Sequence, residues 1–213
     1  TEGYLPLRQF IVERISRYGL QPCVDNVIIT SGSQQALDLI GMVFIDPHDL
    51  IAVEAPTYVG ALQAWRSYQA DFLSIPMDDD GLRVDRLEAM IQQRRPKFVY
   101  VLPNFQNPSG VTLSLERRQA LIDLARRYDL FIVEDDPYGD LRYEGEDLAP
   151  LFAMAAPPNG QGGFEGNFLY TGTFSKTLSP GLRLGWLVGP AEVMAKIRPP
   201  SPIRPAPTTA CTQ

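Results

Sequence analysis

Short apolar, β-branched segments alternate along most of this chain with segments whose apolar residues recur at helical spacing. Residues 33–45 carry such a periodic pattern, with Ala36, Leu37 and Ile40 on one predicted helix face. The apolar runs predict strands at 27–30, 50–53, 72–75, 98–102, 130–133 and 168–170, and the periodic segments predict helices at 33–45, 58–68, 84–93 and 115–128.

The alternation of strands and helices predicts an α/β fold. Because the predicted strands are apolar nearly throughout, both faces of the sheet should be covered by helices, which is typical of a mostly parallel sheet in a three-layer α/β/α domain. Ligands of such sheets bind beyond the carboxyl ends of the strands. We therefore expect the functional residues directly after the strands.

The composition is that of a soluble globular protein, with 45% of the 213 residues hydrophobic and 21% charged. A net charge of −6 opposes binding to nucleic acid or to an anionic membrane. No apolar stretch approaches the roughly 18 residues of a membrane span, and the first residues do not resemble a signal peptide. We expect a cytoplasmic protein whose partners are small molecules.

Cysteine and histidine are scarce. Cys23 and Cys211 lie nearly the whole chain apart without metal-binding spacing, and His48 is the single histidine. We expect neither a disulfide nor a metal site.

Polar residues follow the predicted strands. Residues 31–35, Ser-Gly-Ser-Gln-Gln, open a helix whose free N–H groups favour an anion, unless Ser31 or Ser33 is merely an N-cap. Tyr58 follows the second predicted strand, either as a stacking ring or as a packing residue. Asn107 lies in a polar turn that either presents its amide side chain to a ligand or is an ordinary turn.

Two further strand ends carry charge. Residues 134–136 are three consecutive carboxylates, which are costly at a strand end unless Mg²⁺ or a protonated ring nitrogen compensates them. After the last predicted strand, Lys176 lies close in sequence to Thr173, Ser175 and Arg183. Lys176 is either a surface residue or an amine whose pKa is lowered by partial burial beside a cation. A phosphate seat, a ring, an amide, a carboxylate and an amine together meet the requirements of pyridoxal phosphate.

The ordered motifs resemble the large domain of the fold-type I, class I/II aminotransferases, which depend on pyridoxal phosphate. The resemblance is greatest to the 2-aminoadipate, kynurenine and aromatic aminotransferase branch, which also includes the aminotransferase-like domains of MocR-type regulators. It rests on Ser31-Gly32-Ser33-Gln34-Gln35, Pro56-Thr57-Tyr58, Asn107-Pro108-Ser109-Gly110, Asp135-Asp136-Pro137-Tyr138, Thr173-Phe174-Ser175-Lys176 and Pro180-Gly181-Leu182-Arg183.

The resemblance implies a role for each motif residue. Lys176 would form the Schiff base with the cofactor and move the substrate proton. Asp135 would pair with the pyridine nitrogen, because the family aspartate precedes the motif tyrosine, here Tyr138, by three residues; Asp136 is then only its neighbour. Asn107 and Tyr138 would hold the phenolic oxygen. The remaining predicted contacts are stacking by Tyr58 and phosphate binding by Ser33, Gln34, Thr173, Ser175 and Arg183, with Phe174 as packing.

The resemblance covers residues 1–197, which we expect to form the cofactor-binding large domain. The family has further segments on both sides, so the chain is expected to be truncated at both ends, without the small domain and the arginine that binds the substrate carboxylate. Residues 198–213 are rich in proline and resemble nothing in the family, and Arg204 does not replace that arginine. We expect a disordered or non-native tail there, and a frameshift would explain it.

The family resemblance implies transamination between an amino acid, such as 2-aminoadipate or an aromatic amino acid, and a 2-oxo acid, with 2-oxoglutarate as acceptor. The full-length family forms homodimers, and this chain alone is expected to have weak or no activity. Three alternatives stay open: a cofactor-binding sensor domain of a MocR/GntR-type regulator, a non-functional fragment, and a lyase or decarboxylase on the same scaffold.

Overall fold

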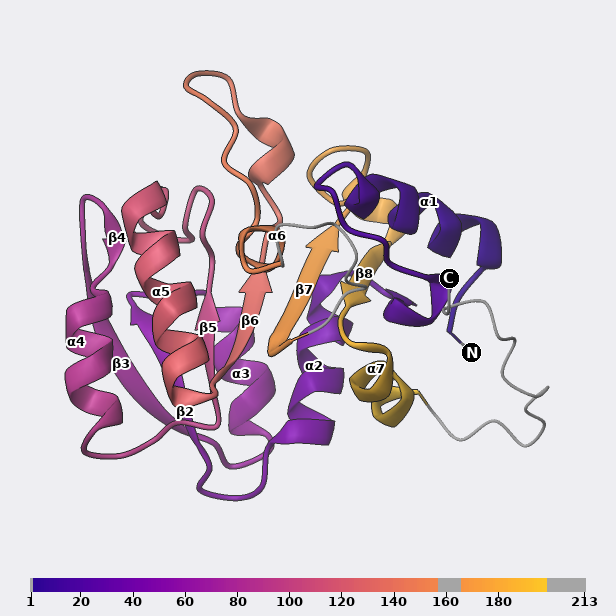
Figure 1. Cartoon of the computed structure of the whole chain (residues 1–213). Helices are drawn as coiled ribbons and strands as arrows, with labels where there is room; N and C mark the ends of the chain where they lie inside the picture. The colour runs from indigo at the N-terminus through magenta and orange to yellow at the C-terminus, as the bar shows by residue number, and fades with distance from the viewer. Residues whose placement is uncertain (1, 157–165, 199–213) are drawn as a thin grey trace.

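The alternating pattern folds into one mixed sheet with helices on both faces, as Figure 1 shows for this computed structural model, which describes residues 2–156 and 166–198. The spatial strand order is β1-β8-β7-β6-β5-β2-β3-β4. The bounds are β1 (Val27–Thr30), β2 (Leu50–Ala55), β3 (Asp71–Asp78), β4 (Gly81–Leu82), β5 (Phe98–Val101), β6 (Phe131–Asp135), β7 (Phe168–Thr173) and β8 (Gly185–Val188).

The sheet is mostly parallel. Strands β7, β6, β5, β2 and β3 run parallel to one another, whereas β8 is antiparallel to both β1 and β7, and β4 is antiparallel to β3. Because β8 reverses direction between β1 and β7, these two strands end at the same edge. In the register, Thr30 and Thr173 both pair with Gly185.

Helices cover both faces of the sheet. Their bounds are α1 (Leu5–Ser16), α2 (Ser33–Phe44), α3 (Val59–Arg66), α4 (Val84–Ile91), α5 (Leu115–Tyr128), α6 (Leu151–Met154) and α7 (Ala191–Ile197), with short 3₁₀ helices η1 (Val24–Asn26), η2 (Gly139–Leu141) and η3 (Pro180–Leu182). In the described part of the chain, no helix is long and apolar enough to span a membrane.

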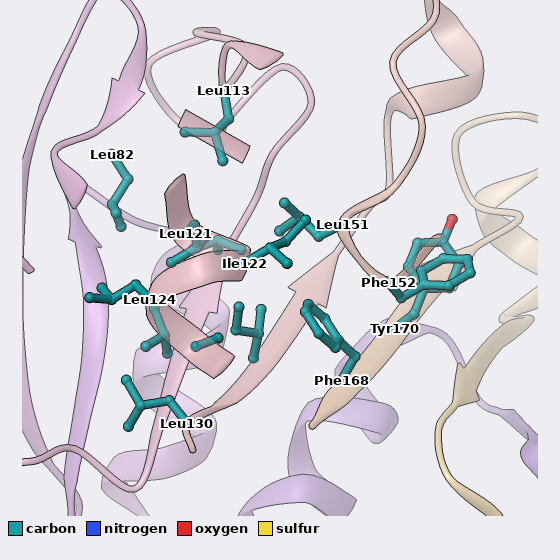
Figure 2. Packing of buried hydrophobic residues seen from close by; sticks show 14 of the residues in the cluster. Leu82, Leu113, Leu121, Ile122, Leu124, Leu130, Leu151, Phe152, Phe168 and Tyr170 are labelled. Carbon is teal, nitrogen blue, oxygen red and sulfur yellow. The ribbon is translucent and has the colours of Figure 1, made fainter. Parts of the chain in front are cut away.

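Two buried clusters sandwich the sheet. One includes residues of α1, α4, α5 and α6, and Figure 2 shows Leu121 and Ile122 of α5 in this cluster with Leu82, Leu151 and Phe168. The other includes residues of α2, α3 and α7. Burial on both faces explains why the central strands are apolar at nearly every position, and the predicted three-layer fold is confirmed.

The predicted elements agree with the structure except at their ends. The strand at 27–30 and the helix at 115–128 have the predicted bounds, whereas the helix predicted at 58–68 is limited to Val59–Arg66. The sequence pattern did not predict α1, β4, α6, β8 or α7. Of the predicted tail at 198–213, only Arg198 is among the described residues. Cys211 lies outside them.

Candidate active site

The ten residues predicted to bind the cofactor all line one cavity of about 240 Å³. The arrowheads of β6 and β7 point to the same edge of the sheet in Figure 1, and the cavity lies at this edge. Its predicted members are Ser33, Gln34, Tyr58, Asn107, Asp135, Tyr138, Thr173, Ser175, Lys176 and Arg183. The structure thus brings them together, and what they bind stays a prediction.

The N-terminus of α2 opens on this cavity. Its N-cap is Gly32, in a left-handed conformation at φ 74°, and no side chain caps the helix. The alternative that Ser31 or Ser33 serves as the N-cap is therefore wrong. A Cβ atom at Gly32 would lie 2.7 Å from Nη2 of Arg183, so glycine allows both the turn and the close approach of the guanidinium.

Hydroxyl groups and a cation surround this helix end. The backbone N–H of Ser175 donates to the Thr173 hydroxyl at 3.1 Å, and that hydroxyl lies 3.1 Å from the carbonyl oxygen of Leu184. Arg183 itself has a left-handed backbone, at φ 50°. Free N–H groups, hydroxyls and a guanidinium form a seat for an anion such as phosphate.

Tyr58 connects the next turn to α2. Its hydroxyl donates to Oε1 of Gln34 at 3.3 Å, and Nε2 of Gln34 donates to the carbonyl oxygen of Gly60 at 2.9 Å. The ring packs against one of the buried clusters and also lines the cavity. The packing interpretation of Tyr58 is thus confirmed, and stacking of its ring on a ligand stays a prediction. Phe174 packs on Trp186, with ring centroids 4.8 Å apart, and does not line the cavity.

The turn that carries Asn107 is held by a residue that the sequence did not single out. Gln106 is 1% exposed, and its Nε2 lies 2.7 Å from the carbonyl oxygen of Pro56 and 3.2 Å from Oε2 of Glu54. Its Oε1 accepts from the backbone N–H of Ser109 at 2.9 Å. Burial raises the pKa of Glu54 to about 8, although bonds from Leu102 and Gln106 lower it. Gln106 therefore ties the Tyr58 turn to the Asn107 turn.

The three consecutive carboxylates, of which Glu134 and Asp135 end β6 and Asp136 follows it, contact different partners. Glu134 accepts the N–H groups of Leu151 and Phe152 at 2.9 and 3.2 Å, at the start of α6, and burial raises its pKa to about 8. Asp136 accepts Nδ2 of Asn104 at 3.0 Å and the N–H of Gly139 at 2.9 Å. Neutral N–H groups therefore provide these hydrogen bonds to Glu134 and Asp136.

A buried arginine adds positive charge nearby. Arg118 is 0% exposed, and its guanidinium donates to the carbonyl oxygens of Leu113, Ala149 and Pro103 and to Oδ1 of Asn104, at 2.7–3.0 Å. Its charge lowers the pKa values of Glu134 and Asp136, against the larger effect of burial. Like Gln106, Arg118 was not singled out from the sequence.

Asp135 is the carboxylate that faces the cavity. It is 2% exposed; its Oδ2 accepts the Tyr100 hydroxyl at 2.7 Å, and its Oδ1 is buried without a hydrogen-bond partner. Burial raises the pKa of Asp135 to about 7, with the Tyr100 hydrogen bond lowering it and the charge of Asp136 raising it. The sequence could have indicated Tyr100, because a tyrosine inside a fully buried strand needs a partner for its hydroxyl.

Of the two alternatives for Lys176, a surface residue or a partly buried amine, the structure agrees with the first in its exposure. Its side chain is exposed rather than partly buried, because the turn after β7 lies at the open rim of the cavity. Its Nζ lies 5.9 Å from the ring centroid of Tyr138. Lys97 pairs with Asp49 at 3.0 Å at the opposite edge of the sheet. Of the three lysines, only Lys176 lines this cavity.

A second cavity, of about 450 Å³, lies on the other side of the 135–138 turn. Asp136 lines this one, so the structure assigns the two neighbouring aspartates to different cavities. In this second cavity, Nε of the lining residue Arg142 lies 3.4 Å from Oδ1 of Asp147, which also lines the cavity. No lysine lines the second cavity. We therefore place the chemistry in the smaller cavity.

The lining of the smaller cavity fits a ligand with an anionic group, an aromatic ring and a ring nitrogen. The N–H groups, hydroxyls and guanidinium of the anion seat can bind the anionic group, and the Tyr58 ring can contact the aromatic ring. The unpartnered Oδ1 of Asp135 can accept a hydrogen bond from the ring nitrogen. Within residues 2–156 and 166–198, no group of three or more His, Cys, Asp or Glu side chains is arranged to hold a metal ion.

The comparisons of the sequence and of the structure with known proteins point to the same protein family. The family model for aminotransferase class I and II matches residues 1–207. Aromatic-amino-acid aminotransferase 1 of Thermococcus litoralis is 47% identical over 203 residues, which cover 92% of this chain and 47% of that protein. The uncharacterized HTH-type transcriptional regulator YisV of Bacillus subtilis is 35% identical over 196 residues, covering 92% of this chain and 39% of the regulator.

A solved structure shares the fold. The α-aminoadipate aminotransferase LysN of Thermus thermophilus, in complex with N-(5'-phosphopyridoxyl)-L-leucine, superposes with a TM-score of 0.83 at 40% sequence identity, covering 92% of this chain and 48% of that one. The present chain thus spans about half the length of the curated aminotransferases it matches.

Proposed function

Because the chain belongs to the class I and II aminotransferases, we propose that the protein transfers the amino group of an amino acid to a 2-oxo acid with pyridoxal phosphate as its cofactor. One observation carries this proposal. The buried, unpartnered Oδ1 of Asp135 lines the same cavity as the exposed amine of Lys176. A buried oxygen without a donor is costly, and a protonated ring nitrogen would satisfy it.

The cavity residues divide the binding of the cofactor among them. Arg183 is the charged anchor for the phosphate, with the α2 N–H groups and the neighbouring hydroxyls as further donors. Tyr58 would stack on the ring, Asn107 and Tyr138 would hold its phenolic oxygen, and Asp135 would pair with its nitrogen. The remaining phosphate donors are Ser33, Gln34, Thr173 and Ser175.

When bound, pyridoxal phosphate supplies a ring that accepts the electron pair of the bond broken at the substrate Cα. Lys176 would hold the cofactor through its amine and would carry the proton to and from the substrate Cα. Its place at the open rim, rather than in the interior, suits a group that must move between these two tasks. Asp135 keeps the ring nitrogen charged throughout.

The relatives support a proposal about the substrates. The aminotransferases named above act on aromatic amino acids and on α-aminoadipate. We propose aromatic amino acids or 2-aminoadipate as donors and 2-oxoglutarate as acceptor. A homodimeric assembly in the cytoplasm belongs to the same proposal.

A single-turnover assay tests the function. The chain is loaded with pyridoxal phosphate, desalted and mixed with glutamate, 2-aminoadipate or an aromatic amino acid, without an acceptor. We expect up to one equivalent of the matching 2-oxo acid per bound cofactor, measured by mass spectrometry. Lys176→Ala should form none. No 2-oxo acid from any of these amino acids, with the cofactor bound, would contradict the proposal.

A second candidate is a sensor domain that holds the cofactor without sustained turnover. The 35% identity to the regulator YisV over 92% of this chain favours it. Cofactor binding with no 2-oxo acid formed would support the sensor, whereas product formation would support the enzyme.

A further inference from the structure

We infer that Tyr100 is a positioning residue, whose hydroxyl holds the Asp135 carboxylate so that one oxygen is fixed and the other is presented to a ring nitrogen in the cavity. This inference rests on the proposed function, because it assumes a ligand with such a nitrogen. Tyr100 does not line the cavity, so it would act only through Asp135.

The strand register places Tyr100 for this contact. Tyr100 of β5 pairs with Val133 of β6, so both side chains lie on the same face of the sheet. Asp135 lies two residues after Val133 and therefore projects from that face too. The long tyrosine side chain reaches past Val133, and its hydroxyl donates to Oδ2 of Asp135 at 2.7 Å.

The ring that carries this hydroxyl is held firmly. Tyr100 is 0% exposed and packs edge-on against Trp65 of α3, with ring centroids 5.0 Å apart and planes at 88°. Nε1 of Trp65 donates to the carbonyl oxygen of Leu37 in α2 at 2.9 Å. Two helices thus fix the donor, which leaves the carboxylate little freedom to rotate.

The hydrogen bond also favours the charged form of Asp135. Burial and the neighbouring Asp136 both raise the pKa of Asp135, and the Tyr100 bond opposes them. Tyr100 remains protonated as a donor, because burial and the charges of Asp135 and Glu54 raise its pKa well above the ordinary value. An ionised Asp135 is the form that can pair with a protonated ring nitrogen.

The test removes the hydroxyl and keeps the ring. Tyr100→Phe, Asp135→Asn and the double variant are compared with the unmodified chain in a double-mutant cycle. Tyr68→Phe is the matched control, because Tyr68 also donates to a carboxylate, Asp38, at 2.9 Å, but at the surface. Pyridoxal phosphate affinity is measured by fluorescence titration, and cofactor labelled with ¹⁵N in the ring reports the protonation of its nitrogen by NMR. Circular dichroism and urea unfolding give the folded fraction used to correct each affinity.

Loss of a hydrogen bond to a charged group should weaken cofactor binding about tenfold or more in Tyr100→Phe. The ¹⁵N signal should shift toward that of unprotonated pyridine, and Tyr68→Phe should change neither. In the Asp135→Asn background, Tyr100→Phe should have no further effect. An unchanged affinity and ¹⁵N signal, or the same loss in both backgrounds, would overturn the inference. If the unmodified chain binds no pyridoxal phosphate, the proposed function fails and the inference fails with it.

Discussion

Ionisation of the buried Asp135 carboxyl should lower the free energy of unfolding of the cofactor-free chain at alkaline pH. The variant Asp135→Asn, which cannot ionise, tests this directly. The folded-state pKa of Asp135 is about 7 because the carboxyl is buried, whereas an unfolded aspartate titrates near about 3.9. Between these values the folded chain binds more protons than the unfolded chain, so its free energy of unfolding falls as the pH rises. The contribution of neutral Asp135 is fully present below about pH 4 and is lost as the pH passes 7.

The size of the effect follows from the pKa. Each pH unit over which only the unfolded Asp135 is ionised changes the free energy of unfolding by about 1.4 kcal/mol. From pH 5 to the pKa near 7, the loss from Asp135 is therefore about 3 kcal/mol. Glu54 and Glu134, with pKa values of about 8, also make the free energy of unfolding fall as the pH rises. The contribution of Asp135 is therefore obtained by comparing the pH dependence of the unmodified chain with that of Asp135→Asn.

The assay is urea unfolding of the cofactor-free chain at pH 5 and pH 9, followed by circular dichroism. The loss of stability between the two pH values should be about 3 kcal/mol smaller in Asp135→Asn than in the unmodified chain. Asparagine can still accept the Tyr100 bond, so the fold should be retained. Asp38→Asn is the control, since Asp38 is an exposed carboxylate that also accepts a tyrosine hydroxyl. Equal pH dependence in Asp135→Asn and the unmodified chain would refute the reasoning.

Three further substitutions test other parts of the site. Gly32→Ala should cost about 1–3 kcal/mol in unfolding free energy, since it places an alanine at φ 74° and ψ 168°, a region essentially restricted to glycine, and by displacing Arg183 it should weaken pyridoxal phosphate binding in a fluorescence titration; unchanged affinity would contradict the anion seat. Gln106→Leu removes the Gln106 donor to the Pro56 carbonyl oxygen and one of the two donors to Oε2 of Glu54, which keeps only the Leu102 N–H. It should cost about 1–3 kcal/mol in urea unfolding, whereas a neutral result would show that the link is unimportant. Arg118→Met removes the Arg118 donor from the carbonyl oxygens of Leu113 and Ala149 and should lower the free energy of unfolding by about 3 kcal/mol or more; a loss below about 1 kcal/mol would contradict its structural role.

The apolar pattern predicted the centre of the fold better than its ends. The central strands are covered on both faces, so nearly every position is apolar and the signal is strong. The helix α1 was missed because it buries only a narrow stripe, Arg8, Ile11 and Ile15, among polar residues. The strand β8 was missed because it has four residues and follows a turn that was interpreted only as a motif.

The site was predicted where its residues follow strands and missed where they lie within the fold. Ser33, Lys176 and the other motif residues reach the cavity directly, so their order in the sequence was informative. Tyr100 and Gln106 act through contacts with residues distant in sequence, 35 and 50–52 positions away. No local pattern reveals such contacts, because they depend on strand register and on turn geometry.

Covalent trapping tests the central claim most directly. The chain is mixed with pyridoxal phosphate, the imine bond is reduced with borohydride, and the digested peptides are mapped by mass spectrometry. The chain offers three lysines, Lys97, Lys176 and Lys196, and only Lys176 lines the cavity with Asp135 and Arg183. The account predicts one phosphopyridoxyl group per chain, on Lys176. Label on Lys97 or Lys196 with none on Lys176 would contradict it.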